Sequence, residues 1–357
     1  MPLTPLHFGP LHIGFPVVQA ALSGYSDWPM RVIARRHGAS YTLCEVMLDQ
    51  FLLAVKQRKK NRHFLHVSDE EHPVGGQLMG ADPEQFGPAA LRLVAAGFDV
   101  IDINFGCPVK KVLGRCRGGF HLGQPEVAIE IVRRTRDAVP DHIPVTVKMR
   151  RGIDDSEQSR RHFFEILDGA FAAGVAAVTV HGRTVKQRYV GRSRWEFLRE
   201  VKQHAGDRTI LGSGDLFTAE DCLNMIVQTG VDGVTVARGA IGNPWIFCQA
   251  RALASGYPLP TPPALAEQRD VMLEHFQLAE EIYGPERCGI PMRKFGIKYS
   301  ALHPEWKNVR ESFARVKNLA DWRTVLDRWY DHDSPGQYPP TEVHMGTASC
   351  TTDPESY

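Results

Sequence analysis

Short apolar runs rich in Val, Ile and Thr alternate with longer segments of helical period along most of this chain. From Phe15 onward the alternation repeats eight times, a pattern typical of strand–helix units built around a parallel sheet. Eight such units match a (β/α)8 TIM barrel in number and length, whereas a doubly wound open sheet usually has fewer strands. We therefore predict an α/β fold with a TIM (β/α)8 barrel.

The expected strands cover residues 16–21, 41–46, 74–79, 100–104, 145–149, 177–181, 209–213 and 233–237. The expected helices cover residues 28–37, 83–96, 125–139, 157–173, 195–204, 219–229 and 243–254, and the connection 48–72 is irregular and charged. Active sites of such barrels lie on the loops that follow the strands, so residues at the strand ends carry functional weight.

The composition changes after Ala254. A Pro-rich stretch at 257–263 predicts a stiff extended linker. Helical spacing of apolar residues at 264–283, 292–302 and 308–330 predicts a smaller C-terminal helical domain. We therefore expect a barrel domain at 1–256, a helical domain at 264–330, and a disordered tail at 331–357 that is rich in Pro, Ser, Thr and Gly.

The composition narrows the possible classes of protein. The 357 residues are 43% hydrophobic and 23% charged, as in ordinary globular chains. A formal net charge of +1 means that any nucleic-acid contact must come from a local patch. Seven cysteines without a Cys-x-x-Cys pair, and no secretory or membrane-spanning apolar segment, predict a cytoplasmic protein with no bound metal and no membrane contact.

Polar residues follow several of the expected strands. Gln77, Asn104, Lys148 and His181 lie at the ends of consecutive strands, so the barrel would bring them to one mouth. Lys148 would be a positive charge at the end of a buried strand, which is costly unless it meets an anion or an electron-rich ligand. A flavin ring meets this requirement, and an ion pair with Asp102 is the alternative. His181 could donate to such a ligand, although a lone histidine there is more often structural.

The seventh and eighth strands end in Ser213-Gly214-Asp215 and Ala237-Arg238. In TIM barrels these two loops commonly form a phosphate site, with open backbone amides and a donor such as Arg238. Two tight turns with a surface arginine remain the alternative.

Two further segments have both a functional and a structural interpretation. The small-residue turn Ala21-Leu22-Ser23 lets backbone approach a flat ligand, but it is also compatible with an ordinary strand-to-helix turn. Cys107 precedes Pro108, which keeps it out of helical geometry and on an extended loop. A buried inert cysteine is the alternative.

Taken together, the motifs closely resemble the tRNA-dihydrouridine synthases, especially the bacterial B-type subgroup. The matching stretches, in the same order, are Ser23-Gly24-Tyr25-Ser26-Asp27, Gln77-Leu78-Met79-Gly80, Asp102-Ile103-Asn104-Phe105-Gly106-Cys107-Pro108, Val180-His181-Gly182-Arg183-Thr184, Gly212-Ser213-Gly214-Asp215 and Ala237-Arg238-Gly239-Ala240.

This resemblance implies an FMN-dependent TIM barrel whose helical domain grips tRNA. NADPH (or NADH) would reduce FMN, hydride would pass to C6 of a flipped uridine, and Cys107 would protonate C5. Asn104 and Arg183 would contact the substrate. The residues implied to hold FMN are Ala21, Leu22, Ser23, Gln77, Lys148, His181, Ser213, Gly214, Asp215, Ala237 and Arg238.

The sequence departs from the family pattern in three places. Ala21-Leu22-Ser23 replaces Pro-Met-Ala, and Ser213 replaces Asn, which backbone binding would tolerate. Phe120 and His121 replace small residues, and they would narrow the space for cofactor or substrate.

Between Arg287 and Lys317 lie eight Lys or Arg residues and two acidic ones, interleaved with Phe295, Tyr299, Trp306 and Phe313. Such a segment suits phosphate neutralisation and base stacking, so we expect tRNA as the partner of a monomeric protein. A solvated charged face with aromatics in the core is the alternative. A second basic run covers 56–62. The competing functions are reduction of a small pyrimidine or enone, action on ribosomal RNA, and RNA binding without catalysis.

Overall fold

The computed structural model describes residues 3–55 and 61–340. The chain forms two compact units. The first comprises the described residues up to Arg188, with Arg192–Ala240 and Trp245–Leu259. The second comprises Tyr189–Gly191, Ile241–Pro244 and the described residues from Pro260 onward. No helix in the described part of the chain is long and apolar enough to cross a membrane.

The first unit is built on a closed parallel barrel, which confirms the predicted fold. Its eight strands are β3 (Val17–Gln19), β4 (Thr42–Leu43), β6 (Val74–Met79), β7 (Val100–Phe105), β8 (Val145–Arg150), β9 (Ala177–His181), β10 (Thr209–Ser213) and β11 (Gly233–Val236). Strand β11 pairs with β3, and β4 pairs with β6, so the sheet closes. The strand expected at 41–46 divides, because β5 (Met47–Leu48) pairs separately with the end of β6.

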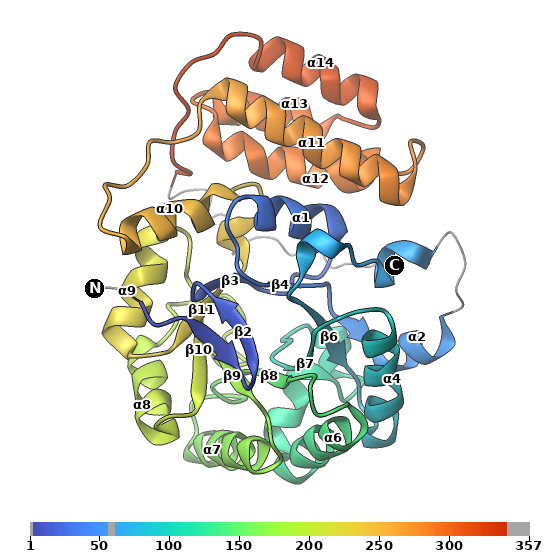
Figure 1. Cartoon of the computed structure of the whole chain (residues 1–357), viewed down its shortest axis with the longest axis vertical. Helices are drawn as coiled ribbons and strands as arrows, with labels where there is room; N and C mark the ends of the chain where they lie inside the picture. The colour runs from blue at the N-terminus through green and yellow to red at the C-terminus, as the bar shows by residue number, and fades with distance from the viewer. Residues whose placement is uncertain (1–2, 56–60, 341–357) are drawn as a thin grey trace. The chain divides into compact units, whose positions relative to one another are not determined.

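Helices surround these strands in Figure 1. They are α1 (Trp28–Arg36), α4 (Pro83–Ala95), α6 (Pro125–Ala138), α7 (Glu157–Ala172), α8 (Trp195–Ala205), α9 (Ala219–Thr229) and α10 (Trp245–Ala254), all close to the expected ranges. Side-chain caps fix several starts. Asp82 caps α4, because its carboxylate accepts a hydrogen bond from the Glu84 amide. Pro83 follows it, and proline suits the first turn of a helix.

The charged connection before β6 contains short helices that the sequence did not predict. They are α2 (Asp49–Ala54), α3 (Arg62–Leu65) and the 3-10 turn η2 (Asp69–Glu71). A buried ion pair between Arg31 of α1 and Glu71, 2.6 Å long, holds this connection against the barrel. Residues 56–60 of the second basic run lie outside the described residues.

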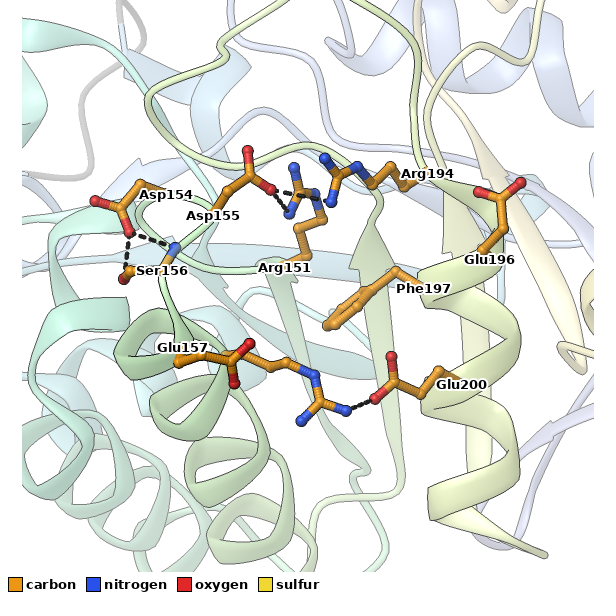
Figure 2. Close-up of a pocket in the computed structure, with 10 residues that line it drawn as sticks. Arg151, Asp154, Asp155, Ser156, Glu157, Arg194, Glu196, Phe197 and Glu200 are labelled. Carbon is orange, nitrogen blue, oxygen red and sulfur yellow. Dashed lines mark hydrogen bonds and ion pairs between the residues drawn. The ribbon is translucent and has the colours of Figure 1, made fainter.

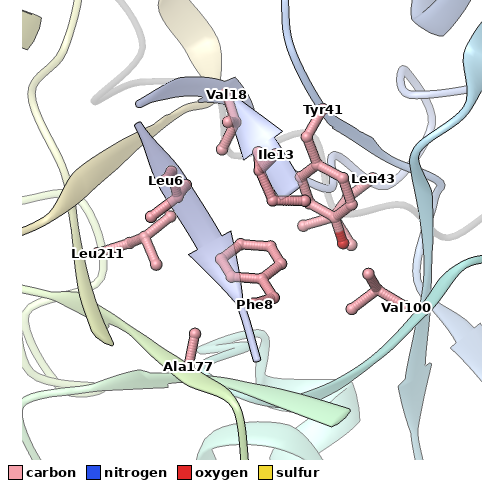
Figure 3. Packing of buried hydrophobic residues seen from close by; sticks show 9 residues of the cluster. All are labelled: Leu6, Phe8, Ile13, Val18, Tyr41, Leu43, Val100, Ala177 and Leu211. Carbon is pink, nitrogen blue, oxygen red and sulfur yellow. The ribbon is translucent and has the colours of Figure 1, made fainter. Parts of the chain in front are cut away.

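An antiparallel hairpin of β1 (Leu6–Phe8) and β2 (Leu11–Gly14) precedes the barrel. The side chains of Leu6, Phe8 and Ile13 pack on barrel residues near the amino ends of the strands, among them Val100 and Ala177 (Figure 3). Burying three such side chains contributes roughly 1.5–3 kcal/mol each. The hairpin therefore fills the amino end of the barrel.

The second unit is helical. It contains α11 (Leu265–Tyr283), α12 (Gly289–Tyr299), the turn η5 (Ser300–Leu302), α13 (Trp306–Ala314) and α14 (Leu319–Trp329). The segment expected to be helical at 308–330 is thus two helices. The break occurs at Asn318, whose side chain accepts the Asp321 amide and starts α14.

Residues 331–340, the first part of the tail that was expected to be disordered, form backbone hydrogen bonds to the second unit. The Ser334 carbonyl oxygen accepts the Leu265 amide at 2.9 Å, and the Gln337 amide donates to the Leu302 carbonyl oxygen at 2.8 Å. The Pro- and Gly-rich composition signalled the absence of a helix, but these backbone groups still find partners in the second unit. Residues 341–357 lie outside the described residues.

Candidate active site

A buried network of amides and a carboxylate joins the three neighbouring strands β6, β7 and β8. The Gln77 side chain donates to Asp102 at 2.7 Å and accepts from the Asn104 amide at 2.7 Å. Thr146 on β8 donates to the other Asp102 oxygen at 2.6 Å. Burial raises the pKa of Asp102, although these two hydrogen bonds favour its ionised form. The network fixes the orientation of both amide side chains.

Asn104 also shapes the loop that carries Cys107. Its side-chain oxygen accepts the backbone amides of Gly106 at 2.9 Å and Cys107 at 3.1 Å. Burial raises the pKa of the Cys107 thiol despite the nearby positive charges of Arg150 and Lys148. The thiol is therefore protonated at neutral pH, as a proton donor must be.

Lys148 faces the barrel interior beside this pair, since it is the register partner of Asn104 across β7 and β8. Within the described residues its ammonium forms no ion pair, and the Asp102 carboxylate, bonded to Gln77 and Thr146, favours the charged form of Lys148 only through space. Burial, with the charge of Arg150, lowers the pKa of Lys148 to about 8. The ion pair with Asp102 that was the alternative for Lys148 does not form.

His181 ends β9 one strand further along. Its Nδ1 accepts the Arg183 amide at 3.1 Å, so the ring proton resides on Nε2. Burial and the positive charges of Arg150 and Lys148 hold the pKa of His181 well below its usual value. The ring is thus a neutral donor at neutral pH.

Arg183, expected to contact substrate, is buried and donates to both carboxylate oxygens of Asp215, at 2.7 and 2.8 Å. The Ser193 amide also donates to this carboxylate at 2.8 Å, and Arg238 lies 3.7 Å from it. Asp215 adopts a positive φ of 59°. This is the left-handed region, which Asp adopts more readily than most other non-glycine residues, and the ion pair with Arg183 fixes the side chain of the residue at this turn.

The same loop leaves two backbone amides available. The amides of Gly214 and Asp215 have no acceptor within the part of the chain that the structure describes. Gly214 has a φ of +109°, and a Cβ there would lie 2.6 Å from the Ser193 hydroxyl oxygen, so only glycine fits. Ser213 precedes these amides, and Ala237 and the turn η4 (Arg238–Ala240) follow the neighbouring strand β11.

The turn after β3 is closed by its own side chains. The Leu22 amide donates to the Ser26 hydroxyl oxygen at 2.8 Å, and the Ser26 amide donates to the Leu22 carbonyl oxygen at 2.9 Å. Ala21 is half-buried and Ser23 is exposed.

Two more residues contribute to the site: Arg150, a polar residue at the end of the expected fifth strand, and Thr146, which was not singled out from the sequence. Arg150 donates to the carbonyl oxygens of Gly106 at 2.9 Å, Thr184 at 2.9 Å and Arg188 at 2.7 Å, which ties the cysteine loop to the loop after β9. Thr146 anchors Asp102. Their signal was present, because alternate residues of β8 share one face and Lys148 lies between them.

A separate cavity of about 270 Å³ opens between the loop after β8 and α8, as shown in Figure 2. Its Asp155 carboxylate lies between Arg151 and Arg194, at 2.5 and 3.1 Å. Arg160 likewise pairs with Glu200. Five acidic residues against three arginines line the cavity, so it disfavours a phosphate.

The second unit carries the basic residues expected to contact RNA. Six of them are exposed and form no ion pair among the described residues, namely Arg287, Arg293, Lys307, Arg310, Arg315 and Lys317. Three of the four interleaved aromatic residues cannot stack on bases, since Phe295, Tyr299 and Phe313 are buried. Trp306 is half-exposed. They are core residues spaced by helical period.

A closed parallel barrel with its polar side chains gathered after the strand ends defines a TIM-barrel protein with a site at the carboxyl end of the sheet. Solved structures agree on the fold alone. Histamine dehydrogenase from Rhizobium sp. 4-9 aligns with a TM-score of 0.55 at 14% identity, and the alignment covers 77% of this chain and 50% of the dehydrogenase chain. Morphinone reductase aligns with a TM-score of 0.54 at 14% identity, covering 73% of this chain and 92% of its own.

Sequence comparison is more specific. The family model of dihydrouridine synthase (Dus) matches residues 18–330. A probable tRNA-dihydrouridine synthase of Mycobacterium tuberculosis is 34% identical over 336 residues, covering 92% of this chain and 85% of that protein. The tRNA-dihydrouridine synthase B of Xanthomonas axonopodis pv. citri is 32% identical over 327 residues, covering 91% and 95%. The chain belongs to the dihydrouridine synthase family, which confirms the prediction of this enzyme family from the motifs.

Proposed function

We propose that this protein reduces specific uridines of tRNA to 5,6-dihydrouridine, with FMN as cofactor and NADPH or NADH as reductant. One observation carries the proposal. Lys148 is the register partner of Asn104 on the adjacent strand, and the Asn104 side-chain oxygen accepts the Cys107 amide. Burial favours the protonated Cys107 thiol, and the Lys148 ammonium lacks an ion pair among the described residues. This arrangement supports a role for Cys107 as proton donor next to a positive charge that suits an electron-rich ring.

The residues present fit FMN. Lys148 and the Nε2 proton of His181 supply a charge and a neutral donor at adjacent strand ends, with Gln77 beyond them. The amides of Gly214 and Asp215, with Arg238 nearby, suit a phosphate group. The backbone of Ala21, Leu22 and Ser23, together with Ser213 and Ala237, would line the ring and its side chain. Bound FMN, once reduced, supplies the hydride that C6 of the uracil accepts.

Cys107 would deliver the proton to C5. Its raised pKa keeps the proton on sulfur until the adjacent carbon gains electron density. The Asn104 side-chain NH2 group has two hydrogens, and one of them is bonded to Gln77. The second hydrogen would bind the uracil and orient it. Arg183 was expected to contact substrate, but its bond to Asp215 supports an indirect role instead, in which it would hold the loop that carries the proposed phosphate-binding amides.

The helical unit, proposed as the RNA-binding domain at 264–330, would contact tRNA through its six exposed basic residues. They can neutralise phosphates because none is engaged by a carboxylate within the described residues. A uridine must leave its stack to enter a barrel mouth, so a folded RNA with accessible loops is the substrate class expected.

The test is turnover by the FMN-loaded protein with NADPH and an unmodified tRNA transcript. Dihydrouridine should form at defined positions, while an unstructured RNA of equal length and composition should react far more slowly. Reduction of a free pyrimidine or enone without any effect of tRNA would overturn the proposal, as would modification of a ribosomal RNA transcript alone.

A further inference from the structure

His121 is one of the two bulky residues that the sequence placed near the site, but it does not open into it. The residue lies on the turn η3 (Gly118–Gly123), is 2% exposed, and its Nε2 lies 3.0 Å from the carbonyl oxygen of Gly80. Its ring also packs 5.4 Å from that of Phe105 at the end of β7. His121 therefore joins the η3 turn to the ends of two barrel strands.

The direction of this hydrogen bond follows from its partner. A carbonyl oxygen only accepts, so Nε2 carries the proton and donates. The other ring nitrogen, Nδ1, is buried without a hydrogen-bond partner among the described residues, where a bare acceptor nitrogen costs less than a second N–H would. Burial lowers the pKa of His121, in agreement with a neutral donor.

The acceptor is held in a fixed position. A Cβ added to Gly80 would overlap the Asp49 carboxylate and would lie 2.8 Å from the Phe86 ring. Gly80 is therefore packed between α2 and α4 directly after β6, and its carbonyl oxygen is a rigid anchor.

The donor side connects to Cys107 through the backbone. Two residues before His121, the Gly119 amide donates to the Cys107 carbonyl oxygen at 3.1 Å. At Gly118, which has a φ of +59°, an added Cβ would lie 2.9 Å from the Cys107 Cβ. The η3 turn is thus hydrogen-bonded to Cys107 and packs directly against it.

We propose that His121 is a positioning residue for the cysteine loop. Its hydrogen bond to Gly80 holds the η3 turn against β6, and the turn holds the backbone and Cβ of Cys107. This inference rests on the proposed function only for its catalytic consequence, because the mechanical link to Cys107 follows from the contacts themselves.

A matched pair of substitutions tests it. His121→Gln can keep a donor near Nε2, whereas His121→Leu keeps the bulk and removes the donor. The readout is the rate at which iodoacetamide alkylates Cys107, followed by peptide mass spectrometry in a Cys116→Ser background that removes the exposed thiol of the same loop. His275→Leu, a buried histidine of the second unit bonded to Tyr299, is the control for loss of a buried ring.

We expect His121→Leu to alkylate Cys107 about fivefold to tenfold faster, because losing one buried hydrogen bond frees the turn. His121→Gln and His275→Leu should match the parent protein. In turnover, kcat of His121→Leu should fall while KM for tRNA and FMN content stay unchanged.

An unchanged alkylation rate in a folded His121→Leu protein would overturn the inference. A His121→Gln protein that is alkylated as fast as His121→Leu would overturn it as well. If His121→Leu does not fold, His121→Gln is compared with His121→Asn, whose donor lies at the Nδ1 position and cannot reach Gly80. Faster alkylation of Cys107 in His121→Asn than in His121→Gln supports the inference, and equal rates overturn it. Absence of dihydrouridine formation by the parent protein would refute the proposed function but would leave the alkylation result to stand alone.

Discussion

The Asn104 side-chain oxygen accepts the backbone amide of Cys107 at 3.1 Å, so the proposed uracil contact and the proposed proton donor are fixed to each other. The same amide group donates to Gln77, which is bonded to Asp102. Placement of the thiol is therefore set by a buried polar network rather than by the loop alone.

Asn104→Ala should cost about 1–3 kcal/mol of stability, since it leaves two loop amides and one Gln77 oxygen without partners. Turnover should fall more than tenfold through kcat. Asn104→Asp is the matched control, because a carboxylate can still accept both loop amides but cannot donate to Gln77. Denaturant unfolding and steady-state kinetics separate the two effects. Equal losses in both variants would contradict a role for the loop bonds.

Lys148→Met should stabilise the FMN-free protein and weaken its FMN binding. The native pKa of about 8 lies below the ordinary 10.5, so the unfolded chain binds more protons between these values. Stability of the parent protein should therefore rise from pH 8 to pH 10.5, and below pH 8 the charge should cost about 3 kcal/mol.

This pH-dependent rise should be absent from Lys148→Met in denaturant unfolding. FMN affinity of the parent protein should also weaken above pH 8, as the ammonium loses its proton. Lys186→Met is the control, since Lys186 is exposed and paired with Asp154 away from the barrel interior. A Lys148→Met protein with unaltered FMN affinity would remove Lys148 from the cofactor site.

Asp215→Asn should destabilise the first unit by about 3–5 kcal/mol, because it leaves the buried Arg183 guanidinium without its carboxylate. Glu70→Gln breaks the exposed pair with Arg36 and should cost less than about 1 kcal/mol. Urea unfolding of both variants measures the difference. Similar small costs would mean that the Arg183–Asp215 pair does not hold this loop.

Much of the barrel followed from the sequence because most of its strands are short runs rich in Val, Ile or Thr that alternate with segments of helical period. The hairpin at Leu6–Gly14 was missed since its strands are only three and four residues long, too short for a clear alternation. The break at Asn318 was missed for a similar reason, because the apolar spacing of α13 and α14 continues across it.

The site was predictable only in part. Barrel geometry alone gathers Gln77, Asn104, Lys148 and His181 at one end, so residue type and strand position sufficed for them. Which partner each side chain takes depends on strand register, which is why the Arg183–Asp215 pair was not foreseen. Burial of Phe295, Tyr299 and Phe313 likewise depends on how the helices pack, and local spacing cannot distinguish a core face from a binding face.

Charge reversal at Lys307 and Arg310 of α13 should weaken tRNA binding and lower the slope of log K against log salt by about 1 for each cation removed. Arg133→Glu on α6 is the control for each single reversal, because it changes the net charge by the same amount at a residue that is already paired with Glu130. Filter binding across a salt series gives both quantities. An equal effect of the control would indicate only a general charge effect.

The central claim is that Cys107 supplies the proton to C5. The most direct measurement is single turnover of FMN-loaded Cys107→Ala with NADPH and tRNA, following flavin absorbance and dihydrouridine separately. Reduction of the flavin by NADPH should proceed at the parent rate, while dihydrouridine formation should fall by about 100-fold or more. Formation of dihydrouridine at the parent rate by Cys107→Ala would contradict the account.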